Sequence, residues 1–132
     1  MISERDAALF SYLAYAPLEP NAVTPPSGWT QVIGYNRDDP NGSGFGARVF
    51  RNASTGEYVV AFRGSDAEWN DWTGANLALA TGDRALQLEQ ALWLIADMQK
   101  DGISLSDVTF TGHSLGGGLA TLAAAFFNPI RE

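Results

Sequence analysis

The feature that most limits how this chain can fold is a short apolar strand that runs directly into a glycine-rich turn and then into an apolar helix. Residues 107–111 predict the strand, Gly112-His113-Ser114-Leu115-Gly116 forms the turn, and residues 115–127 predict the helix. The helix is apolar nearly all round, so it belongs in an interior and not on a surface. A buried strand next to a buried helix predicts a layered α/β structure.

The remaining segments fit the same class. Tyr58–Phe62 is continuously apolar, which is typical of a central strand covered on both faces. The order of the elements predicts an α/β fold with a mixed sheet flanked by helices, and we expect residues 1–132 to form one domain. The other predicted elements are a helix over 3–15, strands over 29–35 and 45–51, a polar turn over 36–44, a hairpin turn over 52–56 and a helix over 83–100. The last helix is expected to bury a stripe of Leu88, Leu92 and Ile95 and to end at Gly102.

Charge and composition narrow the range of partners. The chain has 8 Lys and Arg against 15 Asp and Glu, a formal net charge of −7, which argues against nucleic acid because that binding depends on clustered cations. It has no cysteine and one histidine, which excludes thiolate chemistry and Cys-ligated metal sites. We therefore expect no metal and no cofactor.

The amino terminus gives an expectation about location. Residues 1–6 lack the basic start and apolar core of a secretory signal, and no run of about 18 apolar residues offers a membrane span. We expect a soluble chain that is cytoplasmic as synthesised, with secretion by a leaderless route left open.

The turn at residues 112–116 has the G-x-S-x-G pattern of a nucleophile elbow. Its glycines allow a tight turn in which a Cβ would collide with neighbouring backbone. The amino terminus of the following helix would direct unpaired N–H groups toward a developing oxyanion. Ser114 is therefore the candidate nucleophile. The alternative is a glycine-rich helix start that contains a serine by chance.

Further blocks of sequence accompany this motif. They are Val60-Ala61-Phe62-Arg63-Gly64-Ser65, then Asp71-Trp72 with Asn76-Leu77, then Phe110-Thr111-Gly112-His113-Ser114-Leu115-Gly116-Gly117 with Leu119-Ala120. With these residues the chain resembles the amino-terminal part of a class 3 lipase, an α/β-hydrolase family that acts on fatty-acyl esters, while residues 1–56 carry little that is diagnostic. The resemblance implies a partial α/β-hydrolase fold with a mixed and mostly parallel sheet flanked by helices.

The resemblance implies roles for individual residues. Ser114 would be the nucleophile, Ser65 would supply a backbone N–H and its hydroxyl to an oxyanion hole, and Leu115 would supply the second N–H. Arg63 is expected to brace the loop by an ion pair without touching substrate. An ordinary turn serine is the alternative for Ser65.

Residues 66–77 occupy the place where the family carries a short amphipathic lid helix. Trp69 and Trp72 stand there among acidic and amide side chains, as suits a cover over an acyl groove that opens onto a lipid surface. The competing interpretation is that Trp72 is buried against the sheet and the rest forms a surface turn.

The sequence departs from the family at the rest of the catalytic triad. The α/β-hydrolase order is Ser, then Asp or Glu, then His, but Glu132 is the one acid after Ser114 and no histidine follows. His113 adjoins the nucleophile and would point the opposite way, so we expect it to pack or to brace the turn. We expect residues 1–132 to be a fragment whose triad acid and base lie beyond Glu132; the alternative is that another chain supplies them.

On its own, this fragment should be nearly inactive and should self-associate through an unpaired sheet edge.

These features predict a serine carboxyl-ester hydrolase of lipase, phospholipase or esterase type that acts on lipid or other acyl esters through an acyl-enzyme on Ser114. Transient contact with a lipid surface would accompany this activity. A second hypothesis is a catalytically incomplete hydrolase scaffold that binds a lipid or a partner protein. A third, acyl transfer to an alcohol other than water, uses the same residues.

Overall fold

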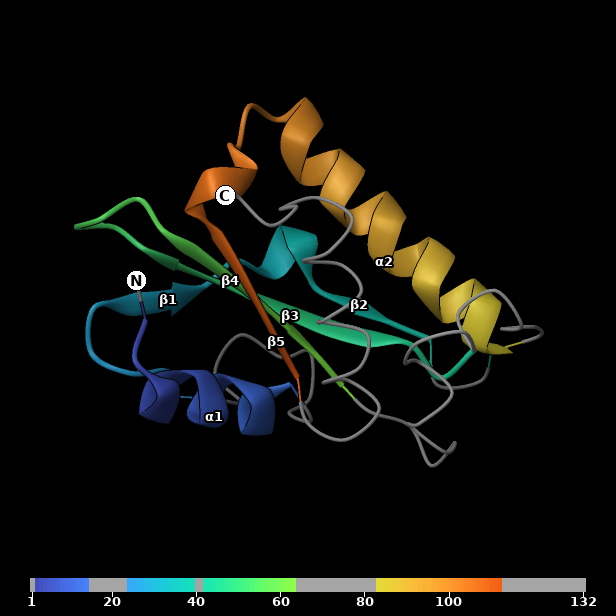
Figure 1. Cartoon of the computed structure of the whole chain (residues 1–132), viewed down its shortest axis with the longest axis horizontal. Coiled ribbons are helices and arrows are strands. Elements are labelled where there is room, and N and C mark those ends of the chain that lie inside the picture. Colours follow the sequence, from blue (N-terminus) through green and yellow to red (C-terminus); the bar gives the residue numbers. More distant parts are fainter. Residues whose placement is uncertain (1, 15–23, 40–41, 64–82, 113–132) are drawn as a thin grey trace, which may run out of the picture.

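A computed structural model of the chain describes residues 2–14, 24–39, 42–63 and 83–112. Within them, one sheet lies between two helices, one on each face (Figure 1). The strands are β1 (Trp29–Gln31), β2 (Arg37–Asp38), β3 (Gly46–Asn52), β4 (Tyr58–Phe62) and β5 (Val108–Gly112), the helices are α1 (Glu4–Leu13) and α2 (Asp83–Lys100), and two 3₁₀ turns are η1 (Ile33–Tyr35) and η4 (Leu105–Asp107).

The sheet has the order β1-β3-β4-β5, with β2 also paired to β3. It is mixed, as predicted, but mostly antiparallel in the described part, because β3 runs antiparallel to β1, β2 and β4 and the parallel pair is β4 with β5. The expectation of a mostly parallel sheet is therefore not met there. The reason is the short turn between β3 and β4, which can join only antiparallel strands, whereas α2 lies in the long crossover to β5.

Strand β4 is covered on both faces, which confirms its predicted central position. Val60 and Phe62 pack in a cluster with α2, while Val59 and Ala61 pack in a second cluster with α1. Successive side chains on a strand point to opposite faces, so one continuous apolar run serves both clusters. The buried members of the α2 cluster are Phe45, Ala47, Val49, Val60, Phe62, Ala91, Leu94, Ile95, Met98 and Val108, and those of the α1 cluster are Phe10, Leu13, Ala14, Trp29, Phe50, Val59 and Ala61.

Helix α1 lies within the predicted range of 3–15, and Ser3 caps its start, since the Ser3 side chain accepts a hydrogen bond of 3.1 Å from the Asp6 backbone N–H. Its inner face carries Phe10, whose ring centroid lies 5.1 Å from that of Trp29 and 4.9 Å from that of Phe50. These aromatic contacts fix α1 against the sheet near β1 and β3.

Helix α2 has the predicted bounds, and Gly102 with a φ of 91° follows its end as expected. The buried stripe differs from the prediction, because Ile95 is buried but Leu88 and Leu92 are only partly so. Apolar residues also lie on the helix surface to either side of the buried stripe, so the spacing of the leucines alone does not determine which of them face the sheet. The stripe instead follows Gln87, Ala91, Leu94, Ile95 and Met98, while Leu86 and Trp93 are exposed.

The predicted strand over 29–35 is wrong beyond Gln31, where the chain turns through η1 and re-enters the sheet as β2. The side chain of Asn36 explains the break, since its Oδ1 accepts a 2.9 Å hydrogen bond from the Val49 backbone N–H. That side chain takes the place of a strand partner, so the backbone can leave the ladder without leaving a buried donor unpaired.

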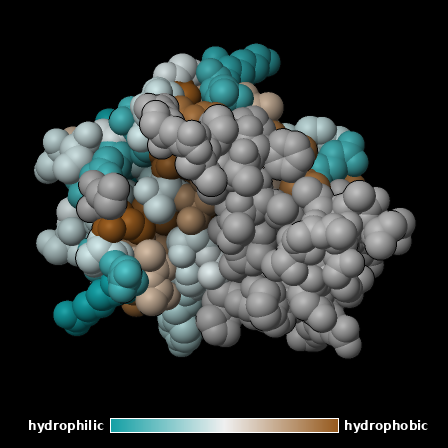
Figure 2. Space-filling model, viewed as in Figure 1, coloured by the Kyte–Doolittle hydropathy of each residue, from teal (hydrophilic) through white to brown (hydrophobic). Residues whose placement is uncertain are grey.

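The surface of the described part is mixed in character. On the face that Figure 2 shows, apolar residues reach the surface in small areas between hydrophilic ones. Among the described helices, none has the length and apolar character needed to cross a membrane.

Candidate active site

The described strands define the sheet edge to which the predicted nucleophile and oxyanion segments are attached. β4 and β5 are parallel neighbours, and their last residues, Phe62 and Gly112, lie opposite each other (Figure 1). The chain therefore leaves toward residue 65 and toward residue 114 from adjacent positions at one edge. Ligand sites in open α/β sheets lie at this carboxyl edge.

The predicted catalytic and lid residues themselves lie outside the described part of the chain. Ser65, Trp69 and Trp72 fall in 64–82, and Ser114 and Leu115 fall in 113–132. Their roles remain predictions, as do the role of His113 and the helix over 115–127.

Arg63 is the described residue next to the predicted oxyanion loop. Its backbone N–H donates to the Gly46 carbonyl at 2.9 Å, its guanidinium donates to the Phe45 carbonyl at 3.3 Å, and it forms an ion pair with Asp38. The predicted ion pair at Arg63 is therefore confirmed. A Cβ at Gly46 would lie 2.7 Å from Cζ of Arg63, so the absence of a side chain there leaves room for the guanidinium.

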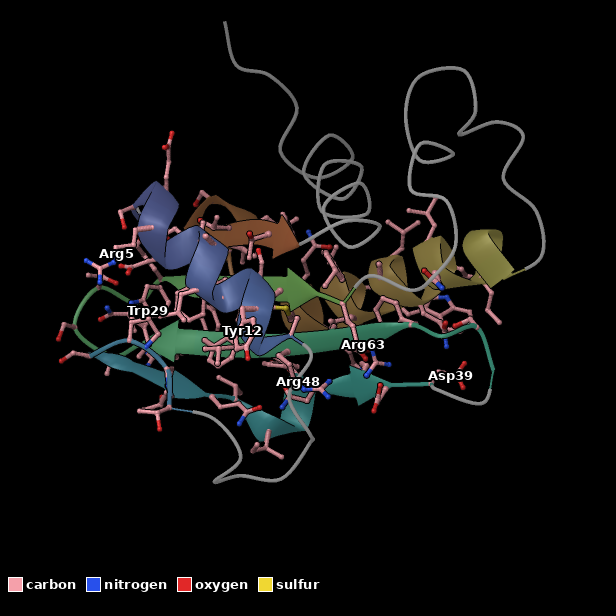
Figure 3. The ribbon with its side chains drawn as sticks, turned by 90° about the horizontal axis from the view of Figure 1, so that it is seen from below. Arg5, Tyr12, Trp29, Asp39, Arg48 and Arg63 are labelled. Carbon is pink, nitrogen blue, oxygen red and sulfur yellow. The ribbon has the colours of Figure 1, made fainter. Side chains whose placement is uncertain are left out.

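A second guanidinium, that of Arg48, lies close to Arg63 on the same side of the sheet (Figure 3). Arg48 is 0% exposed, donates to the carbonyls of Arg37 and Ala47 at 3.0 Å each, and lies 3.9 Å from Asp38 Oδ2. Burial lowers the pKa of Arg48, and the Asp38 carboxylate opposes that shift. Asp38 thus contacts two cations.

Sequence reasoning missed both Asp38 and Arg48. A charged residue inside the apolar run Ala47-Arg48-Val49-Phe50 was a usable signal, because a buried charge requires partners. No local pattern distinguished Asp38, which fell within the predicted polar turn over 36–44.

Polar contacts that are partly or fully buried connect the β2–β3 loop to the first half of α2. Gln90 Nε2 donates to Asp39 Oδ2 at 3.0 Å, Gln87 Nε2 donates to the Ser43 carbonyl at 2.5 Å, and the Ser43 hydroxyl donates to Gln90 Oε1. Because β3 runs antiparallel to β4, this loop lies at the same edge as the ends of β4 and β5.

These contacts predict a pH dependence of stability. The hydrogen bond from Gln90, followed by that from the Ser43 backbone, holds the pKa of Asp39 below its ordinary value of 3.8. A carboxylate with a lowered folded pKa stabilises the fold above its unfolded pKa, and this contribution disappears as pH falls through the folded pKa. Asp39→Asn should therefore lower the free energy of unfolding at pH 7, and the difference from wild type should shrink from about pH 5 toward about pH 2 in urea unfolding curves.

The matched variant for this prediction is Gln90→Ala, which keeps the carboxylate but removes the largest cause of its shift. Its folded pKa should lie closer to the unfolded one, so its acid-induced loss of stability should be smaller than that of wild type and complete at a higher pH. A difference between Asp39→Asn and wild type that stays constant over this pH range would contradict the prediction.

Hydroxyl groups join α1 to the end of β5. Thr111 Oγ1 lies 2.7 Å from Ser11 Oγ, and the Ala7 carbonyl lies 3.2 Å from Thr111 Oγ1 and 2.9 Å from Ser11 Oγ. Each hydroxyl has one proton, so one of them donates to the other, which donates to Ala7. Thr111 directly precedes Gly112, so α1 holds the strand that leads into the predicted elbow.

Replacing Thr111 with valine should lower the free energy of unfolding by about 1 kcal/mol, because Ser11 loses a partner in a largely buried place while the shape of the side chain is kept. Thr30→Val, at an exposed position on β1, is the control and should change it by less than about 0.5 kcal/mol. Equal changes in both variants, measured by urea unfolding, would show that the hydroxyl pair contributes nothing.

Metal-ligating side chains do not gather within residues 2–14, 24–39, 42–63 and 83–112, where no group of three or more His, Cys, Asp or Glu is placed to hold an ion.

Comparison with known proteins identifies the family. The model of the Tle-like phospholipase domain matches residues 6–129. The "Extracellular phospholipase A1" of Serratia liquefaciens is 40% identical over 84 residues, which cover 63% of this chain and 24% of the relative, so the chain spans about a quarter of that protein. The extracellular location is a property of the relative, and the cytoplasmic location expected for this chain stays a prediction. These matches confirm the expected relation to lipid ester hydrolases in the general sense of lipases and phospholipases. The chain belongs to the Tle-like phospholipase domain family.

Proposed function

We propose that the protein containing this chain hydrolyses carboxyl esters of phospholipids, and that residues 1–132 supply the nucleophile and the oxyanion hole as part of one α/β-hydrolase domain related to class 3 lipases. The observation that carries the proposal is the parallel pairing of β4 with β5, with Phe62 opposite Gly112. Membership of a phospholipase family and the phospholipase A1 relative support the substrate class.

Chain length limits how far apart the proposed groups can be. An extended chain spans at most about 3.6 Å per residue, so Ser65 lies within about 11 Å of Phe62, and Ser114 within about 7 Å of Gly112. Because Phe62 and Gly112 are paired neighbours, a strand-end turn at each can bring the two serines to one ester group.

The proposed reaction proceeds through an acyl-enzyme. Ser114 Oγ attacks the ester carbonyl carbon as a base takes its proton, and the carbonyl oxygen becomes an oxyanion. Collapse of this intermediate breaks the ester C–O bond, and the lysophospholipid leaves as an alcohol with the proton returned to it. Water then attacks the acyl-enzyme, releases the fatty acid and regenerates the Ser114 hydroxyl.

The oxyanion would receive backbone N–H groups from Ser65 and Leu115, with the Ser65 hydroxyl as a further donor. Arg63 supports this arrangement, because its three contacts with Asp38, Phe45 and Gly46 hold the chain two residues before Ser65. Donors fixed in advance stabilise the oxyanion without reorganisation during the reaction.

The base and its orienting acid would come from residues other than those printed. The chain has one histidine, His113, which adjoins the nucleophile, and Glu132 is the one acid after Ser114. Residues 1–132 alone would then keep only the modest rate enhancement that an oxyanion hole and substrate binding provide.

Trp69 and Trp72 are proposed to cover the acyl group and to contact the lipid surface. Apolar side chains near the ester would exclude water and strengthen the oxyanion interactions. The net charge of −7 favours zwitterionic over anionic lipid surfaces, since like charges repel.

The experiment that tests this function is incubation of the intact protein with phosphatidylcholine vesicles, followed by identification of the products. Free fatty acid with lysophosphatidylcholine supports the proposal. Release of a phosphorylated head group, or no release of either product, contradicts it.

A second candidate function is that of a hydrolase scaffold that binds a lipid or a partner protein without turnover. The observation that favours it is the position of β5, which has a strand neighbour on one side only among the described strands. An open edge can accept a further strand, including that of a second copy. Stoichiometric phosphonylation of Ser114 without turnover would favour this candidate, whereas sustained fatty-acid release would exclude it.

A further inference from the structure

We propose that Asp38 is a positioning residue for the oxyanion loop: its carboxylate holds Arg63 and thereby fixes the direction in which the chain leaves β4. The inference rests on the proposed function. It concerns a residue far from the G-x-S-x-G motif in the sequence, on a strand only two residues long.

The backbone places Asp38, Gly46 and Arg63 in one row across the sheet. Asp38 on β2 lies opposite Gly46 on β3, and the Arg63 backbone N–H donates to the Gly46 carbonyl on the other side. Two strand spacings, about 10 Å, therefore separate the backbones of Asp38 and Arg63. An arginine side chain can reach across this distance when nothing stands between.

Gly46 is the residue that leaves the path open. A Cβ built there would lie 2.7 Å from both Cζ and Nε of the Arg63 side chain, closer than real side-chain contacts allow. The guanidinium thus passes over the middle strand to reach Asp38, and it also donates to the Phe45 carbonyl. All three anchors of Arg63 belong to the β2–β3 hairpin.

Charge explains why the carboxylate matters. Arg48 is fully buried, and the Asp38 carboxylate lies within ion-pair distance of both Arg48 and Arg63. Without that negative charge the two guanidiniums repel each other, and Arg63, whose side chain is 19% exposed, is the one that can move toward solvent. Movement of Arg63 would shift the start of the loop that carries Ser65.

The test is Asp38→Asn in the intact protein, with phosphatidylcholine hydrolysis and amide hydrogen exchange as readouts. We expect kcat to fall by about tenfold with KM changed less than about twofold, because a misplaced oxyanion donor affects the transition state more than substrate binding. Amide exchange should be faster in peptides covering 63–70 and unchanged in peptides covering 91–100. The control is Asp97→Asn, which removes the exposed 3.1 Å ion pair with Arg37 and should change neither readout.

A second variant keeps the inference testable if Asp38→Asn does not fold. Gly46→Ala retains every charge but places a Cβ in the path of the Arg63 side chain, and it should give the same local change in exchange and the same loss of kcat. Wild-type values at 63–70 in both folded variants would overturn the inference, as would faster exchange throughout the protein, which indicates a merely structural role. If wild type hydrolyses no phospholipid, the proposed function fails, and the exchange data alone decide the role of Asp38.

Discussion

Replacement of Ser114 by alanine is expected to lower kcat for phosphatidylcholine hydrolysis by the intact protein by about 10⁴-fold or more, because the side chain that would form the acyl-enzyme is gone. The loss should approach that of removing the whole triad, since the other members act only through the nucleophile. Fatty-acid release, measured under saturating substrate, gives the rate. The substitution removes one hydroxyl, so we expect the free energy of unfolding to change by less than about 1 kcal/mol.

A matched control for this variant is Ser106→Ala, which removes an exposed serine in η4, at the opposite end of β5. It should retain the wild-type rate. A fluorophosphonate should label the wild type and Ser106→Ala at one site and leave Ser114→Ala unlabelled. Undiminished hydrolysis by Ser114→Ala would end the proposed mechanism whatever the substrate.

Elements with strong local signals were predictable from the sequence. Strand β4 and helix α2 have the predicted bounds, because a continuous apolar run marks the strand and a glycine in the left-handed conformation marks the end of the helix. The start of α1 was predictable for the same reason, since the cap at Ser3 is formed by a side chain three residues from its partner.

Features that depend on distant partners were not predictable in the same way. The segment 29–35 has strand-like composition, but the Asn36 side chain bonds to Val49 and lets the chain turn after Gln31. The position of the buried stripe on α2 likewise depends on the sheet beneath it, and several leucine spacings fit the helical period equally well.

In the candidate site, too, local motifs were predictable and contacts with distant residues were not. Its proposed chemistry-bearing residues were predicted from short local motifs, and the described strands add that the two motifs follow paired strand ends. The support around Arg63 depends on Asp38, 25 positions earlier in the printed chain, and on a glycine between them. The sequence indicated that Arg63 has an acidic partner, but only the pairing of β2 with β3 identifies which one.

Replacement of Phe62 by alanine is expected to lower the free energy of unfolding by about 3 to 5 kcal/mol, the range for a fully buried aromatic side chain. Phe62 is 0% exposed, and its ring centroid lies 6.0 Å from that of Phe45 and 6.3 Å from that of Phe110. The cavity would open at the end of β4, between β5 and the residue that precedes β3, where the closely packed interior has little freedom to collapse. Urea unfolding followed by tryptophan fluorescence measures the change.

Two comparisons separate the cavity at Phe62 from the simple loss of an aromatic ring. Phe62→Leu keeps most of the volume and should cost about 1 kcal/mol, and Tyr12→Ala, at a position 74% exposed, should cost less than about 0.5 kcal/mol. Because Phe62 pairs with Gly112 and precedes Arg63, its cavity lies beneath both strand exits, so Phe62→Ala should lose more hydrolytic activity than Phe62→Leu even where both remain folded. A cost below about 1.5 kcal/mol for Phe62→Ala would mean that the α2 cluster does not extend to the end of β4 in the native protein.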